Sequence, residues 1–100
     1  MTLNRFLCII LKMSCEFCGR EKELTAHHLI PKSMHGRDWF RNRFSKQEMQ
    51  TRIVMLCKDC HHAVHRFFVE KELGKMYNTK EALLNEKKVI DFIKWAKKQK

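Results

Sequence analysis

Four of the five cysteines form two C-x-x-C pairs, and they are the residues with the clearest chemistry in the chain. Thiolates at positions i and i+3 can bind one zinc ion when a tight turn lies between them, and zinc takes four ligands in tetrahedral geometry. Cys15 and Cys18 are followed by Gly19, which can adopt the positive φ that such a turn needs. Cys57 and Cys60 lie where a predicted strand passes into a predicted helix. The two pairs together predict one structural zinc ion.

This zinc site would fasten the start of the helix to the turn, in the arrangement called a treble clef. The alternative is four unrelated buried cysteines, which the two matching spacings disfavour. Cys8 stands alone. The odd number of cysteines argues against a secreted disulfide scaffold. The apolar run 6–11 is too short to span a membrane, and it lacks a small-residue cleavage site for a signal peptide. We therefore expect a cytoplasmic protein whose reduced thiols can bind metal.

Histidines form a second candidate metal-binding group. His61 and His65 are four residues apart on the predicted helix, so they share one face and can chelate one ion. His27 and His28 are neighbours on a predicted strand, so their side chains point to opposite sides. One of them is expected to join the helical pair as a third ligand, and the other to face a substrate phosphate. For any single histidine the simpler interpretation is a core or surface position, and this holds above all for His35 and His62.

Length and charge limit the kind of protein that carries these groups. The chain has 100 residues with 21 Lys and Arg against 11 Asp and Glu, a net charge of +10. This length allows one small domain, excludes a large multidomain enzyme, and leaves a modest core that a metal ion would help to stabilise. The positive charge indicates a polyanionic partner, with nucleic acid favoured over an anionic membrane. No second signal supports membrane binding.

The positive charge is concentrated in two blocks, 27–66 and 75–100, which each carry a net charge of +5. Within the first block, arginines alternate with aromatic residues in a predicted loop. We expect the aromatic side chains to pack on the core and the arginines to contact phosphates, the alternative being merely exposed arginines. The residues predicted to contact nucleic acid are Lys32, Arg37, Arg41, Arg43, Arg52 and Arg66.

The pattern of apolar residues and turn signals predicts an α+β domain with one core. Strands are expected at 23–30, ended by Pro31, and at 52–56. A loop with a helical turn is expected at 33–44, and a capping box at Ser45 predicts a short helix after it. A helix is expected at 59–73 with Gly74 as its stop, and a basic C-terminal helix at 79–97. A short strand or helix is expected at 5–11.

Two segments together resemble one family of nucleases. They are A-H-H-L-I-P-K-S at 26–33 and L-C-K-D-C-H-H-A-V-H at 56–65, and with the first C-x-x-C pair they resemble the HNH endonucleases, the ββα-metal group with a zinc cradle. The resemblance covers about 15–66. It implies that His27 is a metal ligand, that His28 is the general base, and that His61 and His65 are the ligands from the helix.

The chain departs from the family pattern at the middle Asn, which in the family binds the metal or holds the loop that carries the histidine pair. Its place is near Arg52, which would instead clamp a phosphate. His35, Asp38 and Asn42 are further candidates to replace it, His35 first. An all-imidazole site favours zinc, nickel, cobalt or manganese over magnesium, which prefers oxygen ligands.

The leading hypothesis is therefore a metal-dependent HNH endonuclease that hydrolyses DNA phosphodiester bonds, built as a single zinc-stabilised treble-clef/ββα-metal domain. Its core would span about 15–73, with a C-terminal basic helix at about 79–97. It would need one structural zinc ion and one catalytic divalent ion (Mn, Ni, Co, Zn or Mg). The alternative is a non-catalytic treble-clef module that binds nucleic acid, favoured by the missing Asn. A structural zinc protein with a protein partner would explain the cysteines but not the histidines.

Overall fold

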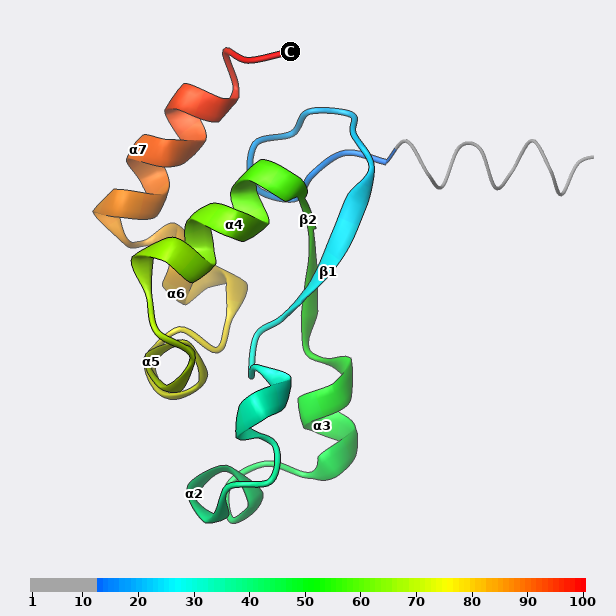
Figure 1. Cartoon of the computed structure of the whole chain (residues 1–100), viewed down its shortest axis with the longest axis vertical. Coiled ribbons are helices and arrows are strands. Elements are labelled where there is room, and N and C mark those ends of the chain that lie inside the picture. The colour runs from blue at the N-terminus through cyan, green and yellow to red at the C-terminus, as the bar shows by residue number, and fades with distance from the viewer. Residues whose placement is uncertain (1–12) are drawn as a thin grey trace, which may run out of the picture.

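The structure is a computed structural model that describes residues 13–100, so Cys8 and the element expected at 5–11 lie outside the described residues. It is an α+β arrangement of one two-stranded sheet and several short helices (Figure 1). The strands are β1 (Leu24–His28) and β2 (Ile53–Cys57), and a 3-10 helix spans Lys32–Met34. The α-helices are α2 (Asp38–Arg41), α3 (Lys46–Thr51), α4 (Lys58–Phe67), α5 (Glu70–Met76), α6 (Lys80–Leu84) and α7 (Lys87–Ala96).

The two strands pair antiparallel at the places where the sequence predicts them. In their register Leu24 lies opposite Cys57, and His28 opposite Ile53. His27 lies opposite Val54, and both are buried, because residues directly opposite each other on paired strands share one face of the sheet. The strand pairing therefore sends His27 toward the core, and it leaves its neighbour His28 on the other face.

Helix α4 is the central element, because it packs on the hairpin on one side and on α7 on the other (Figure 1). Val64 on α4 and Val89 and Ile93 on α7 are buried in one apolar cluster. A second cluster of four buried residues fills the end of the molecule formed by α2, α3 and the 3-10 helix. Its members are Ile30, Met34, Phe40 and Met49. The aromatic Phe40 thus packs in the core, as the sequence predicts.

The helix predicted at 59–73 is wrong in its extent, because the segment forms two helices, α4 and α5, with an interruption between them. Phe68 has an extended backbone, with φ −134° and ψ 139°, and its buried ring stacks 4.4 Å from that of Tyr77. Gly74 is no helix stop, since it lies inside α5. A Cβ at Gly74 would come within 2.6 Å of the Phe40 ring, so the glycine permits α5 to approach the second cluster.

The other helix predictions are confirmed in place and corrected in length. Ser45 caps α3 by accepting a hydrogen bond from the Glu48 N–H, at 3.0 Å. The segment 79–97 holds two helices, α6 and α7, because Asn85 and Glu86 interrupt it. The expected loop 33–44 contains α2 as well as part of the 3-10 helix. In the described part of the chain, no helix has the length and apolar character needed to cross a membrane.

Candidate metal centres

The four predicted cysteine ligands come together at the start of α4, and all four are buried. Their sulfur atoms lie within 4.8 Å of one another, and the Sγ atoms of Cys18 and Cys57 are 3.8 Å apart. A tetrahedral zinc ion with Zn–S bonds of about 2.3 Å places its sulfur ligands about 3.8 Å apart. The four thiols therefore fit a zinc-like ion, as the spacing of the two pairs predicts.

Two local features hold the first cysteine pair in a turn. The Gly19 N–H donates to the Cys15 carbonyl at 3.0 Å, and Gly19 has a φ of +79°, which favours glycine. Glu16 fixes this turn to β2: its N–H donates to the Met55 carbonyl at 3.0 Å, and its carboxylate accepts from the Met55 N–H at 2.7 Å. The turn is thereby placed beside the second pair.

The electrostatics of the four thiols favour a bound cation. The hydrogen bond with Cys60 lowers the pKa of Cys15 to about 4, with smaller contributions from backbone N–H groups. The same hydrogen bond and burial raise the pKa of the Cys60 thiol, and burial raises that of Cys57. Cys15 is thus favoured to ionise, whereas burial opposes ionisation of Cys57 and Cys60. A divalent cation would let all four ionise.

Arg20 is a contact of this group that the sequence analysis missed. Its Nε donates to Cys18 Sγ at 3.2 Å, and its Nη2 donates to Cys57 Sγ at 3.5 Å and to the carboxylate of Asp59 at 3.1 Å. The Cys18 and Asp59 contacts raise the pKa of Arg20 above its ordinary value. Its position two residues after Cys18 is the one sequence signal that could have indicated it.

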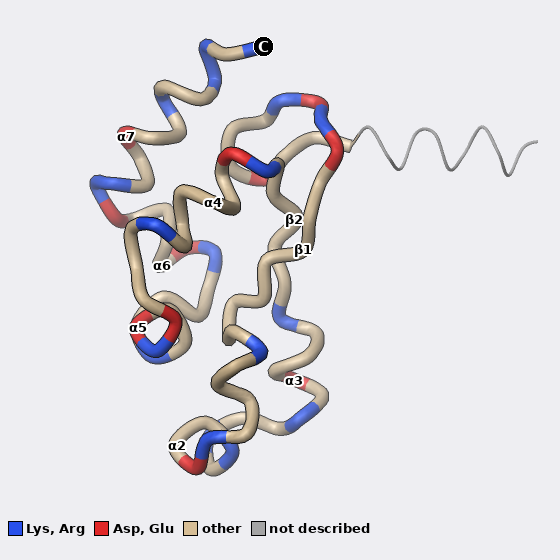
Figure 2. Tube along the Cα trace, viewed as in Figure 1, with Lys and Arg blue, Asp and Glu red and all other residues tan. Residues whose placement is uncertain are grey.

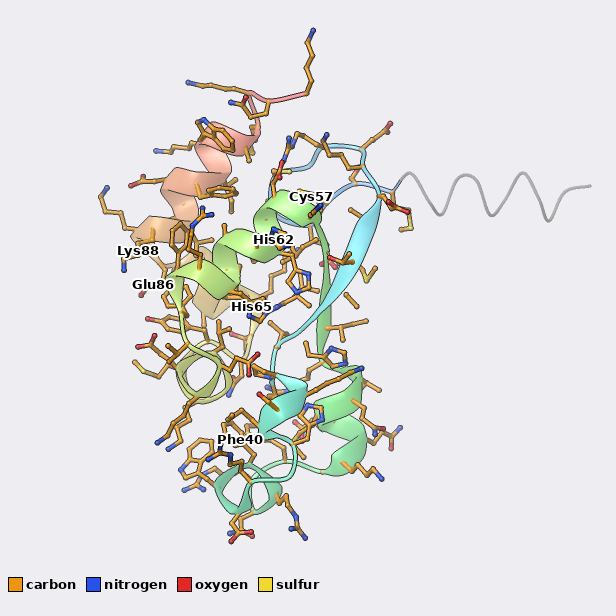
Figure 3. The ribbon with its side chains drawn as sticks, viewed as in Figure 1. Phe40, Cys57, His62, His65, Glu86 and Lys88 are labelled. Carbon is orange, nitrogen blue, oxygen red and sulfur yellow. The ribbon has the colours of Figure 1, made fainter. Side chains whose placement is uncertain are left out.

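The histidine group begins one residue after the cysteine group, on the same helix. Figure 3 labels Cys57 at the start of α4 and His65 further along it. The structure brings His27, His61 and His65 together, with candidate ligand atoms within 4.8 Å of one another. The ring centroid of His27 is 5.3 Å from that of His61 and 5.1 Å from that of His65. Of the strand pair, His27 is thus the residue that faces the helix.

His27 carries the most informative feature of this group. It is fully buried, and neither of its ring nitrogens has a hydrogen-bond partner. Burial lowers its pKa to about 3, with smaller effects from the neighbouring His65 and His61, so the ring is neutral at pH 7. A buried polar atom without a partner is costly and rare. A metal ion held by the three imidazoles would bind one of these nitrogens, so the donor set fits a transition metal.

Thr25 fixes the orientation of His61 and is a second residue that the sequence analysis missed. Its hydroxyl donates to the Leu56 carbonyl at 3.1 Å and lies 2.7 Å from His61 Nδ1. When the hydroxyl donates its one proton to the carbonyl, it accepts from an Nδ1–H of His61. This tautomer leaves the lone pair on His61 Nε2. Thr25 lies two residues before His27 on β1, a spacing that places both on one face.

His28 and His35 lie on the other side of β1. Both are half-buried, and their ring centroids are 6.1 Å apart. Burial, with contributions from Lys32 and His35, lowers the pKa of His28 below its ordinary value. His35 Nε2 donates to the Ile30 carbonyl at 2.7 Å, which ties the 3-10 helix to the segment that follows His28. The Leu29 N–H donates to the Arg52 carbonyl at 2.9 Å, and it holds the same segment to β2.

The predicted nucleic-acid contacts lie mostly at the end formed by α2 and α3, where Figure 2 shows several Lys and Arg positions. Arg37, Arg41 and Lys32 are exposed. Arg41 and Lys46 line a cavity of about 590 Å³ that His35 also borders. Arg66 is exposed on α4, where its guanidinium carbon lies 5.6 Å from the centroid of the Phe67 ring.

Two of the predicted arginines each have several partners in the protein. The Arg43 guanidinium stacks 3.9 Å over Trp39 and donates to its carbonyl. The Arg52 guanidinium donates to Glu48 at 2.9 Å and to the Asn78 carbonyl at 3.1 Å. These contacts fix both side chains, whereas Arg41 has an exposed ion pair with Asp38 at 4.0 Å and Arg37 is exposed. Asp38 and Asn42 lie on α2 and at its C-cap, both exposed and outside the histidine group.

Comparison with known proteins gives one relative. No protein-family model matches the chain, and no solved structure matches it. The chain is 34% identical over 86 residues to the uncharacterized protein YisB of Bacillus subtilis (strain 168), and the alignment covers 85% of this chain and 74% of YisB. On this similarity, which includes most of both chains, the protein belongs to the YisB family.

Proposed function

We propose that this protein is a metal-dependent endonuclease of the HNH type that hydrolyses DNA phosphodiester bonds. One observation carries the proposal: the fully buried His27 has two unpartnered ring nitrogens and lies against His61 and His65. A binding module needs no such buried imidazole beside two others. The hairpin, the following helix and the cysteine group at its start support the proposal, because the HNH resemblance implies a treble-clef/ββα-metal arrangement built from such elements.

His27, His61 and His65 would hold the divalent ion. When bound, such an ion would stabilise the negative charge that develops on the phosphate and on the leaving oxygen. Thr25 supports this role, because it holds His61 in the tautomer that leaves Nε2 free. Loss of such an outer partner typically lowers metal affinity about 10–100-fold.

His28 would act as the general base. Its lowered pKa keeps the imidazole neutral at pH 7, so it can accept a proton from the attacking water. It is half-buried, so part of the ring is open to a substrate. The hydrogen bonds from His35 to Ile30 and from Leu29 to Arg52 hold the segment after it. These two contacts would replace the loop-holding role of the missing Asn.

DNA would bind through its phosphates to the exposed arginines and lysines around α2 and α3. Arg41 and Lys46 border the cavity next to His35, whose ring lies beside that of His28. Contacts of this kind carry no base specificity, and they make affinity fall steeply with salt. The non-catalytic nucleic-acid-binding module remains the second candidate, because an arginine stands where the family has its Asn.

The test is nicking of supercoiled plasmid in the presence of manganese, nickel, cobalt, zinc or magnesium. The wild type should nick DNA with a transition metal, and His28→Ala should nick about 10²–10⁴-fold more slowly while still binding DNA. His62→Ala is the matched control, since His62 is an exposed histidine on α4 outside the three-histidine group. Equal nicking by His28→Ala would exclude the assigned base. Binding without nicking under any metal would favour the module, and activity with magnesium alone would contradict the ligand set.

A further inference from the structure

The side chain of Arg20 joins the two halves of the cysteine group. Its Nε bonds Cys18 on the turn, and its Nη2 bonds Cys57 at the N-cap of α4. The side chain is 9% exposed, so the protein covers most of it. A charge is seldom buried without a partner of opposite sign, because desolvation is costly. The Asp59 carboxylate is one such partner, and the two N–H donors directed at Cys18 and Cys57 favour negative charge on those sulfurs as well.

The net charge of the cysteine group with a bound metal ion explains why a cation, Arg20, lies beside it. Four thiolates around one divalent cation carry two excess negative charges, and all four side chains are buried. Hydrogen bonds from a charged donor are about twice as strong as neutral ones. Arg20 supplies two such bonds, at 3.2 Å to Cys18 and 3.5 Å to Cys57. Cys15 instead accepts from a backbone N–H, that of Phe17, at 3.4 Å.

The planar shape of the guanidinium makes this arrangement specific to arginine. Its donors point in fixed directions from one plane, so one side chain can reach two sulfurs and a carboxylate at once. Asp59 on the first turn of α4 accepts from the same Nη2 at 3.1 Å and orients the group. A lysine would bring the same charge, but it would place a single ammonium near only part of this set.

We infer that Arg20 is a charge-compensating residue of a tetrathiolate metal centre, and that it makes the four metal-bound thiolates unequal by shielding Cys18 and Cys57. A metal-bound sulfur is already ionised, so its reactivity follows its electron density rather than the fraction ionised. Donation from Arg20 withdraws electron density from two sulfurs and lowers their nucleophilicity. Cys15 and Cys60 are then the reactive pair of the centre. This inference concerns the cysteine group and does not depend on the proposed nuclease activity.

The experiment measures alkylation of each cysteine in the zinc-loaded protein by iodoacetamide, in which the thiolate sulfur displaces iodide. Peptide mass spectrometry at low conversion separates the sites. In the wild type, Cys18 and Cys57 should react more slowly than Cys15 and Cys60. In Arg20→Gln, the rates at Cys18 and Cys57 should rise about three- to tenfold, the range that a Brønsted coefficient of about 0.4–0.5 gives when a charged hydrogen bond is lost. Transfer of zinc to a chelator should accelerate as well.

Two further variants separate charge compensation from a merely structural clamp. Lys22→Gln removes one positive charge from the same segment and should leave all four rates unchanged. Asp59→Asn removes the negative charge of the carboxylate but keeps a side-chain oxygen that can accept from Nη2 and orient the guanidinium, so Cys18 and Cys57 should stay protected even where Arg20→Gln does not fold. An equal rise at all four cysteines in Arg20→Gln, or loss of protection in Asp59→Asn, would show that Arg20 only holds the turn to the helix and would overturn the inference.

Discussion

The cysteine group and the histidine group use the same helix in opposite ways. Cys57 and Cys60 bring the first turn of α4 to the turn at Cys15, and every member of this group is buried. The next turn brings His61 and His65 to β1, where His27 is buried, His61 half-buried and His65 exposed. A closed set of four ligands is typical of structural zinc sites, whereas catalytic sites keep an open position. Under the proposed function, the first group would contribute stability and the second would stay open to a substrate.

The surroundings of the two groups differ as much as their exposure. The sulfurs receive hydrogen bonds from a cation, Arg20, because a loaded thiolate group carries excess negative charge. Burial lowers the pKa of His27 and of His61, which keeps both rings neutral at pH 7, and the partner of His61 is a hydroxyl, that of Thr25. An ion among neutral ligands keeps its full positive charge, which is the state that attracts a phosphate. Two adjacent ligand sets on one helix thus offer an ion opposite electrostatic environments.

The largest effect that distinguishes the groups should come from Cys15→Ser. The change removes one of four ligands from the buried group, and structural zinc ions contribute folding free energy directly. We expect loss of bound zinc and of cooperative folding at 25 °C, measured by zinc content and by circular dichroism during urea titration. A folded variant with full zinc content would show that the cysteine group does not stabilise the domain.

His65→Ala should spare the fold and weaken the second metal. Its side chain is exposed, so truncation leaves little cavity in the core, but it deletes one of three imidazole ligands. Loss of a residue that only hydrogen-bonds a metal ligand typically lowers metal affinity about 10–100-fold. Loss of His65, a ligand itself, should lower the affinity for manganese or nickel by more than this. Isothermal titration calorimetry measures this against His62→Ala, which should bind as the wild type does. Unfolding of His65→Ala would show that the histidine group stabilises the fold, as the cysteine group is expected to do, and would contradict the prediction.

Acidification should lower the free energy of unfolding, because His27 is buried and neutral in the folded protein. The unfolded chain takes up a proton on this residue near pH 6.5, whereas the folded protein resists protonation down to about pH 3. The unfolded state therefore binds more protons between these values, so the free energy of unfolding falls as the pH falls, by up to about 1.4 kcal/mol per pH unit. Urea titrations between pH 7.5 and 5.5 should show a steeper fall for the wild type than for His27→Leu. An equal pH dependence of the free energy of unfolding in the two proteins would mean that His27 takes up a proton as readily in the folded state as in the unfolded state.

What the sequence predicted well depends on spacing within short segments. Paired cysteines, histidines four apart on a helix, and adjacent strand histidines determine which side chains can meet, and the two groups form from those residues. The caps at Ser45 and Thr79 are likewise local signals. The hairpin register places the buried His27 opposite the buried Val54.

What it did not predict depends on contacts between distant segments. The break at Phe68 follows from packing against Tyr77, and the burial of Gly74 follows from its approach to Phe40, 34 positions earlier. Arg20 acquires its role only when the turn meets the start of α4. Arg52 has a sequence neighbourhood that fits a phosphate clamp, but it pairs with the local Glu48 four positions earlier and with the carbonyl of Asn78, which only the fold brings near.

The smallest effect tests whether the two groups depend on α4 and the hairpin alone. Thr79 caps α6 by accepting from the Ala82 N–H at 3.1 Å, and it contacts neither group. Thr79→Ala should lower the free energy of unfolding by about 1 kcal/mol, the usual cost of losing such a cap, while Thr79→Ser keeps the hydroxyl and most of the stability. Zinc content and the affinity of the histidine group should stay at wild-type values in both variants. A change in either metal measurement would mean that the C-terminal helices influence the geometry of the ligands. The difference between the closed cysteine group and the open histidine group would then depend on the whole fold rather than on α4 alone.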